Sequence, residues 1–283
     1  KRILGVEVSP DSVSESLGTV EQKAQEWLQR PLNREYWALY IDGTNFRIQR
    51  RGSTEKEPSL VVLGIDSNNR RSILAIEPGQ KDSAECWKVV FEDLKKRGLK
   101  TQAVKIGIMD GLPGLELAFK DSFPNAVTAR CWVHCLKNAI AKVPSRLEDS
   151  FKMLVRKVMY STSESTARVA FDTLKDAMGA DAERSVRCLE KDLESLLVHY
   201  RFEKPLWTAL KTTNPIERIN KELKRRTKPM EALGGNTLMI VTAFTALRME
   251  YQWNKVPVDA KQLDNLKGNN INNIESTLET LIH

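Results

Sequence analysis

The stretch EYWALYIDGTNFRIQRR, residues 35–51, decides the fold class, because its aromatic and β-branched residues favour a buried strand. Its apolar part ends at Asp42, and Gly43 follows. Asp-Gly is a common turn pair, so we expect the strand to break there. The stretch therefore predicts a β-sheet core with an aspartate where a central strand ends.

The next hundred residues alternate between strand and helix patterns. Residues 59–79 predict a hairpin whose turn is Asp66-Ser-Asn-Asn69, and residues 82–98 predict an amphipathic helix that Asp82 or Ser83 caps. A strand over 104–110, a helix that stops before Pro124 and a strand over 125–133 follow. This order is typical of an α/β fold, a mixed sheet with helices packed on it.

The remaining segments are predicted to be helical. Apolar residues recur every three or four positions from residue 134 to about residue 200, and again in 212–228 and 236–253. Near the start, residues 6–30 predict a helix that Ser9 caps and Pro31 ends. This first segment fits the turn and recognition helix of a helix-turn-helix unit, and it equally fits a plain linker helix.

Composition narrows the class of protein. The chain has 283 residues, with 44 Lys and Arg against 37 Asp and Glu, so its net charge is +7, which is compatible with a nucleic-acid partner. No apolar run is long enough for a transmembrane helix, and no signal peptide is visible. Four cysteines without paired spacing favour a reducing, cytoplasmic setting.

Three carboxylates are candidates for one site. Asp42 and Asp110 each close an apolar strand and precede glycine, and ligands of open sheets bind beyond such strand ends. Each Asp-Gly pair taken alone also fits an ordinary turn. Glu217 lies in the first turn of the helix predicted for TTNPIERINKELKRRTK. Asn214 and Glu217 also fit a capping box, and Glu217 and Lys221 also fit an i,i+4 ion pair. If the three meet, all-oxygen ligands predict Mg²⁺ or Mn²⁺.

The motifs YIDGTNF, VKIGIMDG, RCWVHCLKN and TTNPIERINKELKRRTK occur in this order, and over residues 30–253 the chain resembles the Mutator superfamily of DDE transposases, bacterial insertion-sequence branch. The resemblance implies an RNase H-like core interrupted by an all-helical insertion. Its acids fall on Asp42, Asp110 and Glu217, which would hold two divalent ions. The implied units are residues 1–33 (a helix-turn-helix remnant or linker), 34–138 and 206–255 (the core), 139–205 (the insertion) and 256–283 (the tail).

The resemblance implies cleavage of DNA at transposon ends and transfer of the 3′-hydroxyl to a second phosphodiester. Terminal inverted repeats, target DNA and a homodimer are the implied partners, in a bacterial cytoplasm near the nucleoid. The residues expected to bind DNA are Lys221, Lys224, Arg225, Arg226, Arg218, Ser12 and Ser14. The rivals are a structure-selective nuclease or resolvase on the same core, an inactive transposase-derived DNA-binding protein, and a basic helical scaffold.

The Cys-x-x-His signature of the family falls on Cys131 and His134. The sequence offers no fourth ligand at convincing spacing, so a zinc site is disfavoured. We expect the pair instead to order the end of the strand beside the acids. The role of the helical insertion is open between a dimer contact and a DNA clamp.

Overall fold

The computed structural model describes residues 2–3, 6–7, 10–50, 53–78, 83–228 and 240–246, with side chains described in 18–47, 58–77, 83–228 and 240–246. Two predicted features, the cap Ser9 and the tail 256–283, lie outside the described residues. The predicted helix over 236–253 is described only at 240–246, which is helical. Among the described helices, none has the length and apolar character that crossing a bilayer requires.

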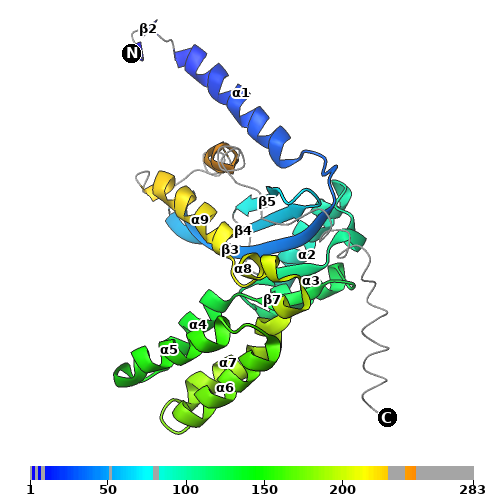
Figure 1. Ribbon diagram of the computed structural model, residues 1–283. Helices are drawn as coiled ribbons and strands as arrows, with labels where there is room; N and C mark the ends of the chain where they lie inside the picture. Colours follow the sequence, from blue (N-terminus) through cyan, green and yellow to red (C-terminus); the bar gives the residue numbers. More distant parts are fainter. Residues whose placement is uncertain are drawn as a thin grey trace.

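A five-stranded mixed sheet forms the centre of the molecule (Figure 1), in the order β5-β4-β3-β6-β7. The strands β3 (Tyr36–Arg50), β4 (Ser53–Asp66) and β5 (Arg71–Pro78) are antiparallel neighbours. β6 (Ile106–Met109) and β7 (Val127–Arg130) continue the sheet parallel to β3. The predicted α/β class is confirmed.

The hairpin between β4 and β5 is also confirmed. The Asp66 carboxylate accepts the backbone N–H groups of Asn68 and Arg70, and Asn69 takes the left-handed φ of 61° that closes the turn. The predicted break at Gly43 is wrong, because β3 continues to Arg50. Gly43 pairs with Leu60 of β4, and the ladder to β4 holds the strand extended through the Asp-Gly pair.

Both faces of the sheet are covered, so alternate residues of β3 enter two different cores. Leu39 and Ile41 pack with the helices α2 (Ala84–Lys96) and α3 (Pro113–Ser122). Tyr40 faces the opposite side, where its core includes Ile219 of α9 (Asn214–Thr227) and a residue of the 240–246 helix. A strand covered on both faces is an almost continuous run of apolar residues, which accounts for WALYI.

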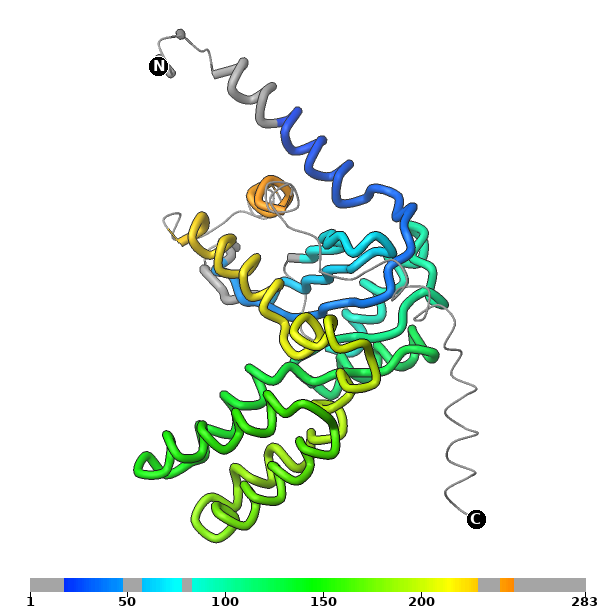
Figure 2. Tube along the Cα trace, in the orientation of Figure 1, coloured from blue at the N-terminus to red at the C-terminus, as the bar shows by residue number. Residues whose placement is uncertain are grey.

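A helical lobe follows β7 and has a core of its own. It contains α4 (Trp132–Ile140), α5 (Glu148–Met159), α6 (Glu164–Met178) and α7 (Glu183–Leu197). The short helices η3 (Val198–Arg201), η4 (Lys204–Leu206) and α8 (Trp207–Leu210) lead back to α9. The chain trace in Figure 2 shows this lobe projecting from the sheet.

The predicted strand over 125–133 is too long at its carboxyl end. β7 ends at Arg130 and α4 begins at Trp132. Trp132, Cys135 and Ala139 are buried at helical spacing in the core of the lobe, and the Trp132 indole N–H donates to the Leu196 carbonyl at 2.9 Å. Helical packing therefore determines the structure of this apolar segment.

The N-terminal helix is shorter than predicted. α1 spans Pro10–Leu28, because Val6–Glu7 (β2) instead pairs with Arg2–Ile3 (β1). Ser12 and Ser14 lie on α1, in the part whose side chains are outside the described set. The helix-turn-helix interpretation stays a prediction.

Candidate active site

The three predicted acids lie in one cleft. It has a volume of about 440 Å³, and its lining comprises Asp42, Gly43, Thr44, Asp110, His134, Glu217, Asn220, Lys221 and Lys224. Ile41 of β3 pairs with Met109 of β6, so the residues that follow, Asp42 and Asp110, emerge side by side. The register of two neighbouring parallel strands thus places two of the acids.

Asp42 lies within β3 and is only 6% exposed. Its Oδ2 accepts a hydrogen bond from Nδ2 of Asn220 on α9, at 3.1 Å. The same amide leaves its Oδ1 buried without a hydrogen-bond partner. A carboxylate and an orphaned carbonyl oxygen therefore lie together in the cleft, an oxygen-rich arrangement suited to a hard cation.

Asp110 follows β6 directly, and its Oδ1 accepts the backbone N–H of Leu112 at 3.1 Å. The turn requires glycine at position 111, where φ is +80°. Arg130 from the end of β7 packs against Gly111, since an added Cβ would lie 0.5 Å from Nη1. Asp110 therefore has both roles considered from the sequence, a turn residue and a member of the cleft.

Glu217 lies in the first turn of α9, and its side chain is 37% exposed. The helix is oriented by Ile216, Ile219 and Leu223, which are buried against the sheet. The predicted capping box is wrong: Thr213 is the cap residue, and no side chain caps the helix. The predicted ion pair with Lys221 is also absent among the described contacts, and Glu217 instead faces His134, with Oε1 3.7 Å from Nε2.

His134 lines the cleft, and the buried Cys131 lies close to it. The Cys131 thiol is buried and accepts hydrogen bonds from the hydroxyl and the N–H of Thr213, at 3.2 and 3.4 Å. Burial raises the pKa of Cys131, but hydrogen bonds with His134 and Thr213 outweigh burial and lower it. The bond to Cys131 raises the pKa of His134 to about 9, against the effect of burial and with help from Asp42 and Glu217. His134 therefore presents a positive charge to the acids at neutral pH.

Two donor sets overlap at Glu217. Cys131 Sγ, a ring nitrogen of His134 and a carboxylate oxygen of Glu217 all lie within 4.8 Å of one another, close enough to hold a metal ion. The other set is the cleft-lining carboxylates of Asp42, Asp110 and Glu217 with Asn220 Oδ1, whose donors are all oxygen. This set is more open, because among the described residues the three carboxylates do not form a group whose oxygens all lie within 4.8 Å of one another. The all-oxygen set suits Mg²⁺ or Mn²⁺, whereas thiolate and imidazole suit softer ions.

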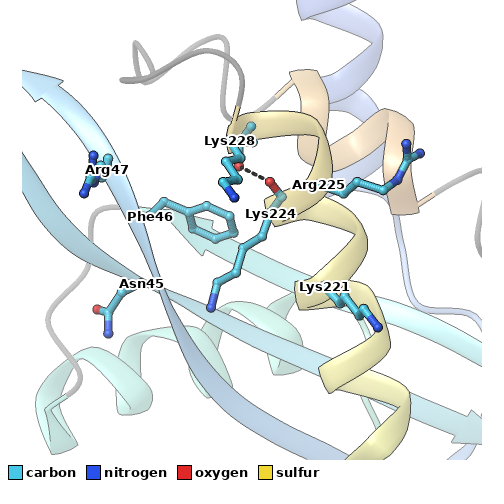
Figure 3. A pocket seen from close by; sticks show the side chains of 8 residues that line it. Asn45, Phe46, Arg47, Lys221, Lys224, Arg225 and Lys228 are labelled. Atoms are coloured by element: carbon cyan, nitrogen blue, oxygen red, sulfur yellow. Dashed lines mark hydrogen bonds between the residues drawn. The ribbon is translucent and has the colours of Figure 1, made fainter.

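A basic groove continues from the cleft, with a volume of about 740 Å³ (Figure 3). The cleft and the groove share Lys221 and Lys224. Residues of β3 also line the groove, and Figure 3 shows Arg47 on this strand across from α9. Its lining is Asn45, Phe46, Arg47, Lys221, Lys224, Arg225, Thr227 and Lys228.

The predicted basic residues of α9 have different environments. Arg225 lines the groove but also pairs with Glu222 at 3.0 Å. Arg226 is 16% exposed, bonds the same Glu222 and does not line the groove. Arg218 is exposed and lines neither the cleft nor the groove. Arg47 was missed by sequence reasoning because the strand was expected to end at Gly43.

Comparison with known proteins places the chain in a family. The family described as "Transposase, Mutator family" matches residues 1–255. The transposase for insertion sequence element IS6120 of Mycolicibacterium smegmatis is 28% identical over 241 residues, covering 85% of this chain and 73% of that protein. The transposase for IS905 of Lactococcus lactis is 27% identical over 230 residues, covering 81% of this chain but only 57% of the relative.

Solved structures with similarity include the Drosophila P element transposase strand transfer complex, at 9% identity and a TM-score of 0.27, covering 88% of this chain and 81% of that one. The catalytic domain of Mos1 mariner transposase has 12% identity and a TM-score of 0.21, and the match covers 66% of this chain and 96% of that domain. Scores this low establish no shared fold. The family match spans most of the sequence, and the chain therefore belongs to the Mutator family of transposases.

Proposed function

We propose that this chain catalyses divalent-metal-dependent cleavage of DNA at the ends of an insertion element, followed by strand transfer. The observation that carries the proposal is the convergence of Asp42, Asp110 and Glu217 in one cleft, from two strand regions and a helix. The sheet order β5-β4-β3-β6-β7, with three antiparallel strands and then two parallel ones, supports an RNase H-like core. The helical lobe before α9 supports an all-helical insertion, proposed over 139–205, although α4 at the start of the lobe already begins at Trp132.

The acids need a cation if they are to act together. Carboxylates about 4 Å apart repel by roughly 1 to 4 kcal/mol per pair, depending on the effective dielectric. Asp42, Asp110 and Glu217 would hold two Mg²⁺ or Mn²⁺ ions, which activate an attacking oxygen and stabilise a leaving one in phosphoryl transfer. Asn220 fixes the Asp42 carboxylate. His134 faces Glu217, with Nε2 3.7 Å from Oε1, and would help to position that carboxylate.

The reaction has two steps at the same cleft. Water first attacks the phosphodiester at the element's end, and the bond to the 3′ oxygen breaks, leaving a 3′-hydroxyl. That hydroxyl then attacks a phosphodiester of the target, forming one ester bond as another breaks. Lys221 and Lys224 line both the cleft and the groove, so they would hold phosphates next to the reacting one.

The proposed substrates are DNA with terminal inverted repeats and target DNA, bound by a homodimer in the bacterial cytoplasm near the nucleoid. The chain spans 57% of the Lactococcus relative's length. Ser12 and Ser14 of α1 are proposed as further DNA-binding residues. The core is proposed to comprise residues 34–138 and 206–255, and residues 1–33 to form a helix-turn-helix remnant or a linker helix.

The test is a labelled duplex that carries an element end, incubated with the chain, Mn²⁺ and a target plasmid. The proposal expects nicked duplex and plasmid-joined label. Hydrolysis without joining would support a nuclease or resolvase. DNA binding without any product would support a transposase-derived binding protein that has lost catalysis.

A further inference from the structure

The helical lobe carries a second groove, along α5. It has a volume of about 620 Å³, and its lining is Asp149, Lys152, Met153, Arg156, Lys157 and Tyr160. These residues recur at three- and four-residue intervals, so they occupy one outward face of α5. The opposite face of α5, which includes Phe151 and Val155, is buried in the core of the lobe.

The charge of this groove is only partly compensated. Elsewhere in the lobe, many exposed basic side chains are paired with carboxylates: Arg146 with Asp181, Arg168 with Glu164 and Glu194, Lys175 with Glu190, and Arg187 with Glu183. In the groove, Lys152 pairs with Glu148. Arg156 and Lys157 are exposed, and neither forms an ion pair with any residue of the described part of the chain. Their charge remains available to an anionic partner.

Large side chains accompany the charge. Met153 is 55% exposed and Tyr160 is 67% exposed, on the same face as Arg156. A helix dipole favours cations at the end of α5, but it gives no reason for an exposed aromatic ring beside them. Clustered Lys and Arg are typical of surfaces that bind a nucleic-acid backbone, and a Tyr hydroxyl can donate to phosphate as well.

The carboxyl end of α5 is tied to the segment that leads into the cleft. The Lys211 ammonium donates to the Met159 carbonyl at 2.7 Å and lies 5.5 Å from the centre of the Tyr160 ring. The Lys211 carbonyl in turn accepts a hydrogen bond from the backbone N–H of Trp132 at 3.0 Å. Figure 1 shows α5 and α9 extending toward the same side of the molecule, and Figure 2 shows the same arrangement.

We propose that the α5 groove is a second binding site for the phosphate backbone of duplex DNA, which holds the duplex on the helical lobe while one strand lies at the acids. The inference rests on the proposed function and assigns the lobe the role of a clamp. A second copy of the chain fits the groove less well, because two copies that each carry a net charge of +7 repel each other overall.

The experiment compares the double variant Arg156→Ala/Lys157→Ala with Arg187→Ala/Lys191→Ala, which removes two exposed charges from α7. Binding of a 40-base-pair duplex is followed by fluorescence anisotropy at several salt concentrations. Each lost phosphate contact should reduce the slope of log K against log salt by about 0.9, so the α5 variant should lose about 1.8 and the α7 variant nothing. Melting temperatures equal to wild type show that both variants are folded.

A slope of the α5 variant equal to wild type would overturn the inference. Lys221→Ala/Lys224→Ala is measured alongside to test the proposed function separately. If only this variant has a reduced slope, the clamp is overturned but the proposed function is not. If wild type binds no duplex, the proposed function and the clamp are both overturned. Unchanged DNA binding with a loss of dimer mass in the α5 variant would assign the groove to a contact between copies and overturn the clamp.

Discussion

Replacing Gly111 with alanine should destabilise the protein strongly, because the residue after Asp110 has no room for a side chain. Its φ of +80° costs an L residue about 1–2 kcal/mol. The added Cβ would lie 0.5 Å from Arg130 Nη1, so the guanidinium must move. Its Nε donates to Asp192 at 3.1 Å with both side chains 16% exposed, and losing such a charged hydrogen bond costs about 1.5–3 kcal/mol.

The sum predicts that Gly111→Ala lowers the free energy of unfolding by about 2.5–5 kcal/mol, measured by urea denaturation. Gly18→Ala is the matched control, because nothing lies within 4 Å of its Cβ and alanine is favoured within a helix by about 0.5–1 kcal/mol. In an Arg130→Ala background, Gly111→Ala should cost only the backbone strain, about 1–2 kcal/mol. Equal costs in both backgrounds would refute the steric argument.

Two further predictions concern DNA binding and pH. Lys221→Ala with Lys224→Ala should reduce the salt slope of duplex binding by about 1.8. Arg226→Ala should not change the slope, because the Arg226 guanidinium bonds Glu222. If the double variant had the same slope as wild type, the phosphate contacts would lie elsewhere. Burial, with the nearby Lys211 charge, lowers the pKa of His199 to about 4 from an unfolded value of 6.5. Between pH 6.5 and pH 4 the unfolded chain binds the proton and the folded protein does not, so stability falls as pH falls. His199→Asn should flatten that part of the pH profile in urea titrations, and an unchanged profile would contradict the assignment.

Local patterns predicted the parts of the fold that local interactions determine. The hairpin turn at Asp66 and the helix α2 with its Ser83 cap form as expected, since their hydrogen bonds link residues close in sequence. Gly43 was misjudged because its partner, Leu60, belongs to another strand. The short apolar segment at Trp132 was predicted to continue a strand, but a run this short fits either structure, and packing in the lobe makes it helical.

The candidate site shows the same division. The strand-end rule predicts that Asp42 and Asp110 face one crevice, and both line the cleft, although β3 does not end at Asp42. Asn220 went unnoticed because its importance depends on a contact with Asp42, 178 residues away. The i,i+4 spacing of Glu222 and Arg226 predicts their ion pair. The basic residues of α9 therefore do not form one DNA-facing surface, since Arg226 does not line the groove.

Asp110→Asn shows whether the acids of the cleft form a metal-dependent catalytic site. Wild type, this variant and the control Asp121→Asn, an exposed aspartate paired with Lys88, are each incubated with Mn²⁺ and an element-end duplex labelled on both strands. We expect cleavage by wild type and by Asp121→Asn, and none by Asp110→Asn, with DNA binding equal in all three. Cleavage by Asp110→Asn at the wild-type rate would contradict it.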